Sequence, residues 1–455
     1  MFGAIKNRKE LIDTGVSEAD KKARRLTIEI LEAGLKAADP RKAVKKVLSV
    51  RDENLVVKGK AFSLHDVDRI YVVGAGKASG AMAEAVEQVL GRRITGGYVN
   101  ILKGTSDMFK VSKVVLNEAS HPIPDENGVR GTKKILRLVE NTGNRDLVLV
   151  LISGGASALM PLPAEGLSMK DKQRATNLLL QSGAVIEEIN VVRKHLSGVK
   201  GGQLARAIYP ARCIGLLLSD VVGDDISTIG SGPTAPDKST YGDAFNVLKG
   251  YDLVEGLLRI AQHLEKGMKG LIPETPKPDD ESFTATENFI IGSNEATLKE
   301  MALRAGELGL KAKILDAQMT GEAKEAGRKF AEQINLWSAS GGGTALLQGG
   351  ETTVTVKGAG KGGRNQEFVL GALLSLREKG VAIASMGTDG VDGSSDAAGA
   401  IIDGNSQRMG RRMSLDAERY LVKNDSNTYF SLLKECIVTG PTGTNVNDIV
   451  VGVVV

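Results

Sequence analysis

A glycine-rich loop after an apolar strand carries the residue with the clearest chemical role. Gly74 and Gly76 precede Lys77, and Gly80 follows at the start of an expected helix. Backbone amides at a helix N-terminus and a lysine together form a cradle for anions, so we predict that Lys77 contacts a bound phosphate or carboxylate. The spacing matches neither the dinucleotide-binding motif nor the P-loop. The simpler alternative is a tight strand-to-helix turn with an exposed lysine.

A second glycine-rich segment repeats this layout after the apolar run 146–152. Ser153, Gly154, Gly155 and Ser157 provide hydroxyls and amides that suit the oxygens of a phosphate or a carboxylate. Glycine-rich turns after strands are common, so this segment alone is weak evidence. Because it repeats the first loop in the same expected sheet, it strengthens the prediction of an anion site.

Two aspartates follow apolar strands and are candidate magnesium ligands. Asp220 stands at the tip of the strand expected over 213–219, where hard carboxylate oxygens can reach Mg²⁺ or its waters. Asp224 and Asp225, just beyond it, are more typical of turn caps. Asp389 follows a second apolar strand. The acids around it superficially suggest a calcium loop, but their spacing and the missing glutamate do not fit one, so we expect a magnesium or substrate role.

Three polar residues fall at helical spacing in the segment that we expect to form a helix over about 185–208. Arg193, Ser197 and Lys200 would lie on neighbouring turns, where they could hold a small carboxylate. A basic, solvated helix face is the alternative, and we prefer it for Lys194. His195 has no cysteine or second histidine nearby, so we do not assign it as a metal ligand.

The C-terminal half supplies a second cation. A glycine loop over 358–363 leads into an expected helix, and Arg364 stands near the helix N-terminus. The planar guanidinium of arginine suits phosphate recognition, and a helix N-terminus favours anions. Few structural loops need so many glycines and an arginine, so we predict that Arg364 binds phosphate.

The elements that position these residues alternate between strand and helix. Short apolar runs separated by helical patterns of roughly 10–15 residues indicate parallel strands joined by crossover helices, which form a doubly wound α/β sheet. Such sheets bind ligands beyond the carboxyl ends of their strands. At 455 residues the chain should form two domains, and the proline-rich, acidic segment 271–282 reads as the linker. We expect domains over residues 1–285 and 286–455.

Composition excludes several classes of protein. A net charge of +4 and an aromatic content of 4% do not favour a nucleic-acid binder. No stretch approaches the ~20 apolar residues of a membrane helix, and the first residues do not resemble a signal peptide. Cys213 and Cys436 lie in separate apolar runs without metal-ligand spacing, so we expect reduced, buried thiols and a cytoplasmic protein.

Eight ordered motifs carry a family resemblance over about residues 20–455. They are Gly-Ala-Gly-Lys-Ala (74–78), Ser-His-Pro-Ile-Pro-Asp (120–125), Ile-Ser-Gly-Gly-Ala-Ser-Ala-Leu (152–159), Ser-Asp-Val-Val-Gly-Asp (219–224), Ser-Gly-Pro-Thr (231–234), Gly-Gly-Glu-Thr-Thr (349–353), Gly-Gly-Arg-Asn-Gln-Glu (362–367) and Gly-Thr-Asp-Gly-Val-Asp-Gly (387–393). The chain resembles the glycerate 2-kinase family, whose C-terminal half is the MOFRL domain. The resemblance implies a Rossmann-like N-terminal domain, a second α/β domain, and an active site in the cleft between them.

The same resemblance implies the reaction and its residues. The enzyme would transfer the γ-phosphoryl group of ATP to the 2-hydroxyl of D-glycerate with Mg²⁺, giving 2-phosphoglycerate and ADP, with Lys77 and Arg364 as the catalytic pair. We assign cofactor binding to the two glycine-rich segments and Asn365, and substrate binding to Glu351 beside Arg193, Ser197 and Lys200.

Two rival functions stay open. One is an NAD(P)H-dependent hydroxypyruvate reductase, a name attached to relatives of this family. The absence of an acidic residue about twenty positions after the first glycines speaks against it, because Val99-Asn100-Ile101 lies there. The other is a non-enzymatic sensor of a nucleotide or sugar phosphate. The oligomeric state is open, and a homodimer is compatible with the sequence.

Overall fold

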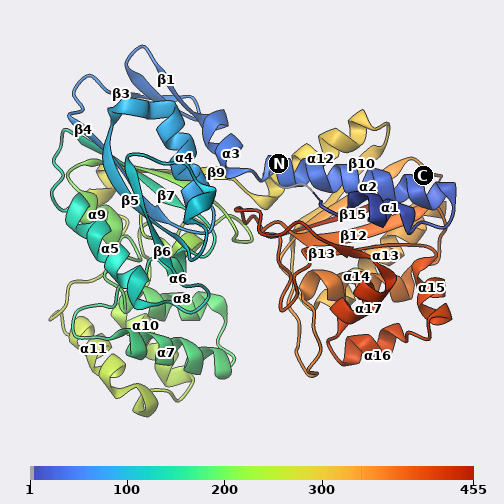
Figure 1. Cartoon of the computed structure of the whole chain (residues 1–455). Helices are drawn as coiled ribbons and strands as arrows, with labels where there is room; N and C mark the ends of the chain where they lie inside the picture. The colour runs from blue at the N-terminus through green and yellow to red at the C-terminus, as the bar shows by residue number, and fades with distance from the viewer. Residues whose placement is uncertain (1–4, 340) are drawn as a thin grey trace. The chain divides into compact units, whose positions relative to one another are not determined.

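The computed structural model describes residues 5–339 and 341–455, which form two compact units. The central unit comprises Pro40–Ile291, and the terminal unit comprises the chain up to Asp39 together with Gly292–Val455. Both units are α/β structures (Figure 1). No helix among the described residues is long and apolar enough to cross a membrane.

The central unit is built on a six-stranded sheet with the order β6-β5-β4-β7-β8-β9. Every pairing from β6 to β8 is parallel. Its strands are β4 (Arg69–Ala75), β5 (Ile94–Leu102), β6 (Val114–Ala119), β7 (Asp146–Ile152), β8 (Arg212–Leu218) and β9 (Thr286–Gly292). Counted along the chain from β4, this order is the doubly wound 3-2-1-4-5-6, which confirms the expected fold class. The strand order reverses between β4 and β7.

Helices cover both faces of this sheet. Helix α4 (Ser79–Leu90) contacts β4, β5 and β7, whereas α5 (Glu126–Val139) contacts β5 and β6, and α9 (Gln203–Ile208) contacts β8. Every residue of β7 is buried, which explains why this strand reads as a continuous apolar run. The sheet therefore presents only its edges and strand ends to ligands.

A helical group extends the central unit and carries Arg193, one of the predicted site residues, on one of its helices. It contains α7 (Met169–Gln181), α8 (Ile186–His195), α10 (Tyr241–Gly250) and α11 (Leu258–Met268), which share one apolar core (Figure 1). The unit is completed by α3 (Pro40–Val47), α6 (Ala156–Leu159) and an antiparallel sheet of β1 (Leu48–Arg51), β2 (Asn54–Val57) and β3 (Lys60–Ser63) that we did not expect from the sequence. Single turns of 3-10 helix lie at Gly91–Arg93, Ser106–Met108, Ile229–Ser231, Glu255–Leu257 and Glu281–Ala285.

The terminal unit contains a second six-stranded sheet, in the order β10-β11-β15-β12-β13-β14. Strands β10 and β11 are parallel, and the other pairs are antiparallel. The strands are β10 (Lys311–Met319), β11 (Thr344–Gly350), β12 (Val381–Gly387), β13 (Gly399–Asp403), β14 (Cys436–Ile437) and β15 (Asp448–Val454). The last strand of the chain thus lies in the interior of the sheet.

Helices also flank both faces of the terminal sheet (Figure 1). One face packs against α2 (Glu18–Ala37) and α12 (Asn294–Glu307), and the other against α13 (Ala323–Ala339) and α14 (Arg364–Ser375). Successive residues alternate between the two cores, since Val451 packs with the first pair of helices and Val450 with the second. The remaining helices are α1 (Arg8–Asp13), α15 (Ser406–Arg412), α16 (Ala417–Val422) and α17 (Ser426–Leu433).

The chain divides differently from the expected 1–285 and 286–455. Strand β9 is the edge strand beside β8, so the central sheet continues past residue 286. The segment before Asp39 belongs to the terminal unit, because α2 buries Ile28 and Leu31 in the core that contains Val451. Amphipathic spacing predicts that a helix has a buried face, but it does not predict which sheet covers that face.

Two elements also differ from expectation. The helix expected over 185–208 is broken: α8 ends at His195, and Gly201 and Gly202 have φ of +56° and +83°, outside the range of a right-handed helix. The segment 352–356, expected to pair as a strand with 344–348, is not a strand; β11 pairs with β10 and β15 instead. Cys213 and Cys436 are both free, as expected, but only Cys213 is fully buried.

A buried network of ion pairs joins α2 to the rest of the terminal unit. Arg24 of α2 is 1% exposed, and its Nε lies 2.5 Å from Oδ2 of Asp403. Its Nη2 donates to Glu435 and to Oγ of Ser406, at 3.1 Å for the latter. Buried carboxylates of this kind are costly without a cation.

We expect Arg24→Ala to lower the free energy of unfolding of the terminal unit by ~3–5 kcal/mol, because it leaves Asp403 and Glu435 buried without their cation. The fluorescence of the sole tryptophan, Trp337 in α13, reports on this unit during denaturant unfolding. The matched control is Lys21→Ala on the same helix, which removes only a partly exposed pair with Glu18 and should change stability by less than about 0.5 kcal/mol. Equal effects from the two substitutions would contradict this role of Arg24.

Candidate active site

The loop that carries Lys77 lies directly on the end of β7. A β-carbon at Gly76 would stand 2.0 Å from Oγ of Ser153, and one at Gly74 would stand 2.0 Å from the carbonyl oxygen of Leu151. Both glycines also have positive φ, +145° for Gly76 and +149° for Gly74. Only glycine permits this approach, so these residues hold the ends of β4 and β7 together at the point where the strand order reverses.

The backbone N–H groups of this loop donate hydrogen bonds to oxygens of the protein itself. The N–H of Gly76 donates to the carbonyl of Asn100 at 3.2 Å, and that of Lys77 to the carbonyl of Gly154 at 2.9 Å. The N–H of Ala78 donates to Oγ of Ser153, which is fully buried, at 3.0 Å. These bonds fix the backbone of the loop, so the half-buried side chain of Lys77 is the group that the loop presents. The cofactor-binding roles of Gly74, Gly76 and Ser153 stay predictions.

Gly155 brings a histidine into the site that the sequence analysis left without a role. Gly155 has a φ of +85°, and a β-carbon there would lie 3.0 Å from Cδ2 of His121 and 3.4 Å from Cγ of Lys77. The side chains of Lys77 and His121 therefore both contact the space above Gly155. His121 belongs to the Ser-His-Pro-Ile-Pro-Asp motif, which was the available signal in the sequence.

The polar groups beyond Gly155 form a chain of hydrogen bonds. Nζ of Lys200 donates to the carbonyl of Ser157 at 2.9 Å, and Oγ of Ser157 lies 2.8 Å from Oγ of Ser231. Ser231 in turn donates to Oδ1 of Asn190 at 3.4 Å. The predicted cofactor residue Ser157 and the predicted substrate residue Lys200 are thus adjacent.

Arg193, Ser197 and Lys200 are close together, although not on one helix. Arg193 lies on α8, whereas Ser197 and Lys200 lie in the loop that follows it. Lys200 is 2% exposed, and burial together with the neighbouring cations Lys172 and Arg193 lowers its pKa well below the ordinary value. Burial also lowers the pKa of Arg193. A region with this electrostatic character favours an anion.

Asp220 follows the end of β8, and the turn after it is capped as expected. Asp225 accepts from the N–H of Ser227 at 2.9 Å and from the hydroxyl of Thr228 at 2.9 Å. These bonds, which outweigh its burial, lower the pKa of Asp225 and keep it ionised. Asp220 itself is half-buried.

In the terminal unit, Arg364 is held by carboxylates. Its Nε and Nη2 donate to the two carboxylate oxygens of Asp448, at 2.6 and 3.1 Å, and its Nη1 pairs with Glu351. Burial alone would lower the pKa of Arg364, but Asp448 and Glu351 outweigh it and raise that pKa. The predicted substrate residue Glu351 is thus a partner of the predicted catalytic residue.

The side chain of Asn365 forms hydrogen bonds within the protein. It is 2% exposed, its Nδ2 donates to Oδ1 of Asp448 at 3.0 Å, and its Oδ1 accepts from the hydroxyl of Ser385 at 2.6 Å. Its backbone N–H donates to Asp392 at 3.0 Å. These contacts support the start of α14, and the cofactor-binding role of Asn365 stays a prediction.

Sequence reasoning missed Asp448. This residue is 1% exposed, and burial, with a contribution from Asp392, raises its pKa to about 7 despite the ion pair with Arg364. The available signal was an acidic residue at the start of an otherwise apolar strand, β15. Asp448 orients Arg364 through two parallel hydrogen bonds, an arrangement that fixes the plane of the guanidinium.

The carboxylates provide donors for a divalent cation but no complete cage. Asp389 is half-buried, and its Oδ1 accepts from the N–H of Val391 at 3.2 Å. Within residues 5–339 and 341–455, no group of three or more His, Cys, Asp or Glu side chains is arranged to hold a metal. Mg²⁺ at phosphate sites usually takes one or two carboxylates and completes its shell with water and phosphate. The donor chemistry of Asp220 and of Asp389 fits such a partial shell.

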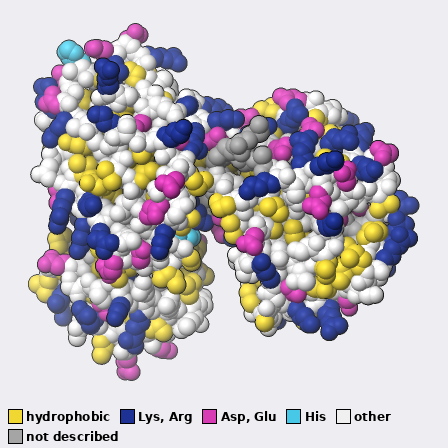
Figure 2. Space-filling view, viewed as in Figure 1, with side chains coloured by type: hydrophobic (Ala, Val, Ile, Leu, Met, Phe, Trp, Pro, Cys, Tyr) yellow, Lys and Arg dark blue, Asp and Glu magenta, His cyan; other side chains and the backbone are white. Residues whose placement is uncertain are grey.

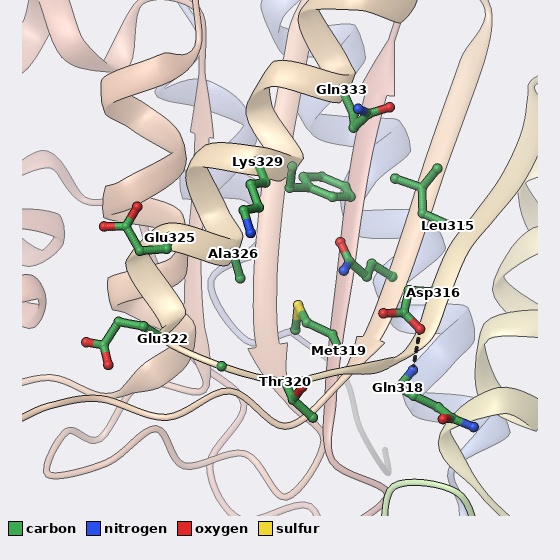
Figure 3. Close-up of a pocket in the computed structure, with 13 residues that line it drawn as sticks. Leu315, Asp316, Gln318, Met319, Thr320, Glu322, Glu325, Ala326, Lys329 and Gln333 are labelled. Atoms are coloured by element: carbon green, nitrogen blue, oxygen red, sulfur yellow. Dashed lines mark hydrogen bonds between the residues drawn. The ribbon is translucent and has the colours of Figure 1, made fainter.

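A cavity in the terminal unit lies apart from these residues. It has a volume of about 450 Å³ and lies beside the end of β10 and helix α13, with Asp316, Glu322 and Glu325 in its lining and Lys329 as its only cationic lining residue (Figure 3). None of the site residues predicted from the sequence lines it. An acidic lining does not suit an anionic substrate. On the visible face of each unit, acidic and basic side chains are interspersed (Figure 2).

Two family models match the chain. The "Domain of unknown function (DUF4147)" matches residues 26–269, and the "MOFRL family" matches residues 344–448. The first begins inside α2, so it includes a helix that the structure places in the terminal unit.

Similar proteins cover nearly the whole chain. The glycerate 2-kinase of Pyrococcus horikoshii is 40% identical over 95% of this chain and 97% of its own length, and the D-glycerate 2-kinase of Thermotoga maritima is 40% identical over 95% and 98%. A crystal structure of glycerate kinase from T. maritima matches with a TM-score of 0.83, covering 95% of this chain and 99% of its own. A protein of Agrobacterium vitis, provisionally named a hydroxypyruvate reductase, is 38% identical over 94% of each chain.

We expect the buried carboxyl of Asp448 to make stability fall as pH rises. Because its pKa increases from 3.8 to about 7 on folding, the native state holds the proton more tightly between those values, and the free energy of unfolding decreases with pH across that window. Between pH 5 and 8 this contribution amounts to about 2–3 kcal/mol. The test is to compare the pH dependence of unfolding of the wild type and of Asp448→Asn, followed by Trp337 fluorescence. If the difference between the two proteins does not change with pH, the assignment is wrong.

Proposed function

Because this chain belongs to the glycerate 2-kinase family, we propose that it transfers the γ-phosphoryl group of ATP to the 2-hydroxyl of D-glycerate, giving 2-phosphoglycerate and ADP. The supporting observation is 40% identity to two enzymes of this name over 95% of the chain. Glycerate and ATP are then its small-molecule substrates. We place the reaction in the cytoplasm, in keeping with the two free cysteines.

Lys77 is the first catalytic cation in this proposal. Phosphoryl transfer passes through a loose transition state whose charge is spread over the phosphoryl oxygens, so positioning and electrostatic stabilisation supply most of the catalysis. The loop fixes the backbone of Lys77 through hydrogen bonds to Gly154 and Ser153. The ammonium group can therefore stabilise the developing charge without reorganisation of the loop.

Arg364 is the second catalytic cation in this proposal. Three of the five N–H groups of a guanidinium are used here, two by Asp448 and one by Glu351, so within the described residues two N–H groups are left for phosphoryl oxygens. Asp448 acts as a positioning residue, because it fixes the guanidinium plane. Lys77 belongs to the central unit and Arg364 to the terminal unit.

The other residues bind and orient the substrates. His121, which shares the space above Gly155 with Lys77, and Ser157 are suited to donating hydrogen bonds to phosphate oxygens, and Arg193 and Lys200 to an anionic group of the acceptor. Asp220 and Asp389 are the residues that would hold Mg²⁺ or its waters. When bound, the ion would neutralise phosphate charge. The in-line approach of the 2-hydroxyl then depends on how tightly the acceptor is held.

Removal of either catalytic cation should slow turnover without unfolding the protein. We expect Lys77→Ala and Arg364→Ala each to lower kcat by at least roughly 10²-fold, because each removes preorganised positive charge from the transition state. ADP release in the presence of D-glycerate, ATP and Mg²⁺ measures the effect. Lys361→Ala is the matched control, since this exposed lysine precedes Arg364 by three residues and, among the described residues, forms an ion pair with Asp396 alone. A near-normal rate in either variant would remove that residue from the mechanism.

Kinase and reductase activity separate in one experiment. We expect glycerate-dependent ADP formation and a product whose phosphate, by ³¹P NMR, is attached to carbon 2. In parallel, hydroxypyruvate with NADH should give no oxidation of NADH, because the first glycine loop lacks the acidic partner of a nicotinamide site. NADH oxidation without ADP formation would overturn the kinase assignment. A phosphate on carbon 3 would retain the kinase but correct the position of transfer.

A further inference from the structure

Three basic side chains from three segments of the central unit converge. Lys172 lies on α7, Arg193 on α8, and Lys200 in the loop between α8 and α9. Nζ of Lys172 donates to the carbonyl of Leu162 at 3.5 Å, and the same carbonyl accepts at 3.2 Å from Oγ of Ser197, which precedes Lys200 by three positions. The charges of Lys172 and Arg193 both act on Lys200. Lys172 is therefore adjacent to the residues already assigned to the acceptor, although nothing in the sequence pattern singled it out.

Among the described residues, none of these three cations is paired with a carboxylate, whereas a neighbouring lysine is. In the described ranges 5–339 and 341–455, neither Lys172, Arg193 nor Lys200 forms an ion pair, and the ammonium groups of the two lysines donate to backbone carbonyls. Lys194, the neighbour of Arg193 on α8, pairs with Asp237 at 3.3 Å in a buried setting. The protein thus compensates the adjacent lysine with its own acid and leaves the converging three without one.

The three charges oppose one another in the absence of an anion. Burial and the charge of Arg193 lower the pKa of Lys172 to about 7, and burial with the charges of Lys172 and Arg193 lowers that of Lys200. Uncompensated buried charge is costly, so a fold that gathers three cations is stabilised by an anion bound among them.

We propose that Lys172, Arg193 and Lys200 form the pocket for the carboxylate of the acceptor, with Lys172 as a specificity-determining residue. The proposal rests on the proposed function. Lys172 and Arg193 are only half-buried, whereas Lys200 is 2% exposed, and the planar shape of a carboxylate matches the fork of Arg193. Ser157, whose carbonyl accepts from Lys200, follows Gly155 by two positions, and a β-carbon at Gly155 would lie 3.4 Å from Cγ of Lys77.

This placement also accounts for the position of transfer. In glycerate the 2-hydroxyl is on the carbon bonded directly to the carboxyl group, and the 3-hydroxyl is one carbon farther away. A pocket that fixes the carboxylate therefore fixes the 2-hydroxyl more closely than the 3-hydroxyl. The pocket then selects both the acid and the hydroxyl.

The test is the substitution Lys172→Met, which keeps the length of the side chain and removes its charge. We expect the KM for D-glycerate to rise about 10-fold or more, because a charge-assisted hydrogen bond to the carboxylate is lost, while the KM for ATP stays within about 2-fold. Lys172→Arg should restore most of the affinity. The matched control is Lys170→Met on the same helix, an exposed residue that should leave both KM values unchanged. Thermal unfolding verifies that each variant is folded, and Lys172→Gln serves as the second neutral variant.

The other outcomes are decisive. A rise in the KM for ATP alone would mean that the pocket holds phosphate, and unchanged KM values in both neutral variants would mean that Lys172 contacts no substrate; each overturns the proposal. Wild-type protein that forms no ADP from glycerate would refute the proposed function, and the pocket is then judged by calorimetry. Binding of D-glycerate but not glycerol, lost in Lys172→Met, supports the pocket, and equal binding of the two compounds overturns it.

Discussion

The contact between Gly76 and the hydroxyl of Ser153 leaves no space for a β-carbon, and the geometry of the central unit follows from it. The contact lies where the strand order reverses, between β4 and β7, so that the loops after these strands diverge on either side of one point. Lys77 leaves one loop and Gly155 begins the other. The side chain of His121 lies against Gly155 as well. In this arrangement the glycines act through close packing, and the side chains of the neighbouring residues carry the chemistry.

The two units differ in how they surround their cations. In the terminal unit, Asp448 and Glu351 hold Arg364, and the cost of burying Asp448 appears as a raised pKa. In the central unit, Lys172 and Lys200 are left facing Arg193, and the cost appears as lowered pKa values of the lysines. The first arrangement fixes the direction of a charge before any substrate binds. The second stores repulsion that a bound anion relieves, so its binding energy comes partly from the protein itself.

The sequence predicts most of the sheet and the edge at which the site lies, because buried parallel strands read as apolar runs and their loops read as glycine, serine and aspartate. It does not predict the unit to which α2 belongs, since a 3.6-residue period describes a face and not its partner. The break between His195 and Gln203 was missed because the polar spacing continued through two glycines with positive φ. Asp448 and Lys172 act only through neighbours that are distant in sequence, so no local pattern marks them.

The interior position of β15 in the terminal sheet bears on how the protein is made. Residues 40–291 form the central unit as one uninterrupted stretch, which can fold while the ribosome is still translating the rest. The terminal unit cannot fold in this way. Its sheet requires β15 between β11 and β12, and its core requires α2 from a distant part of the chain. Until β15 has been synthesised, Ile28 and Leu31 of α2 therefore lack Val451, with which they share a core in the folded unit.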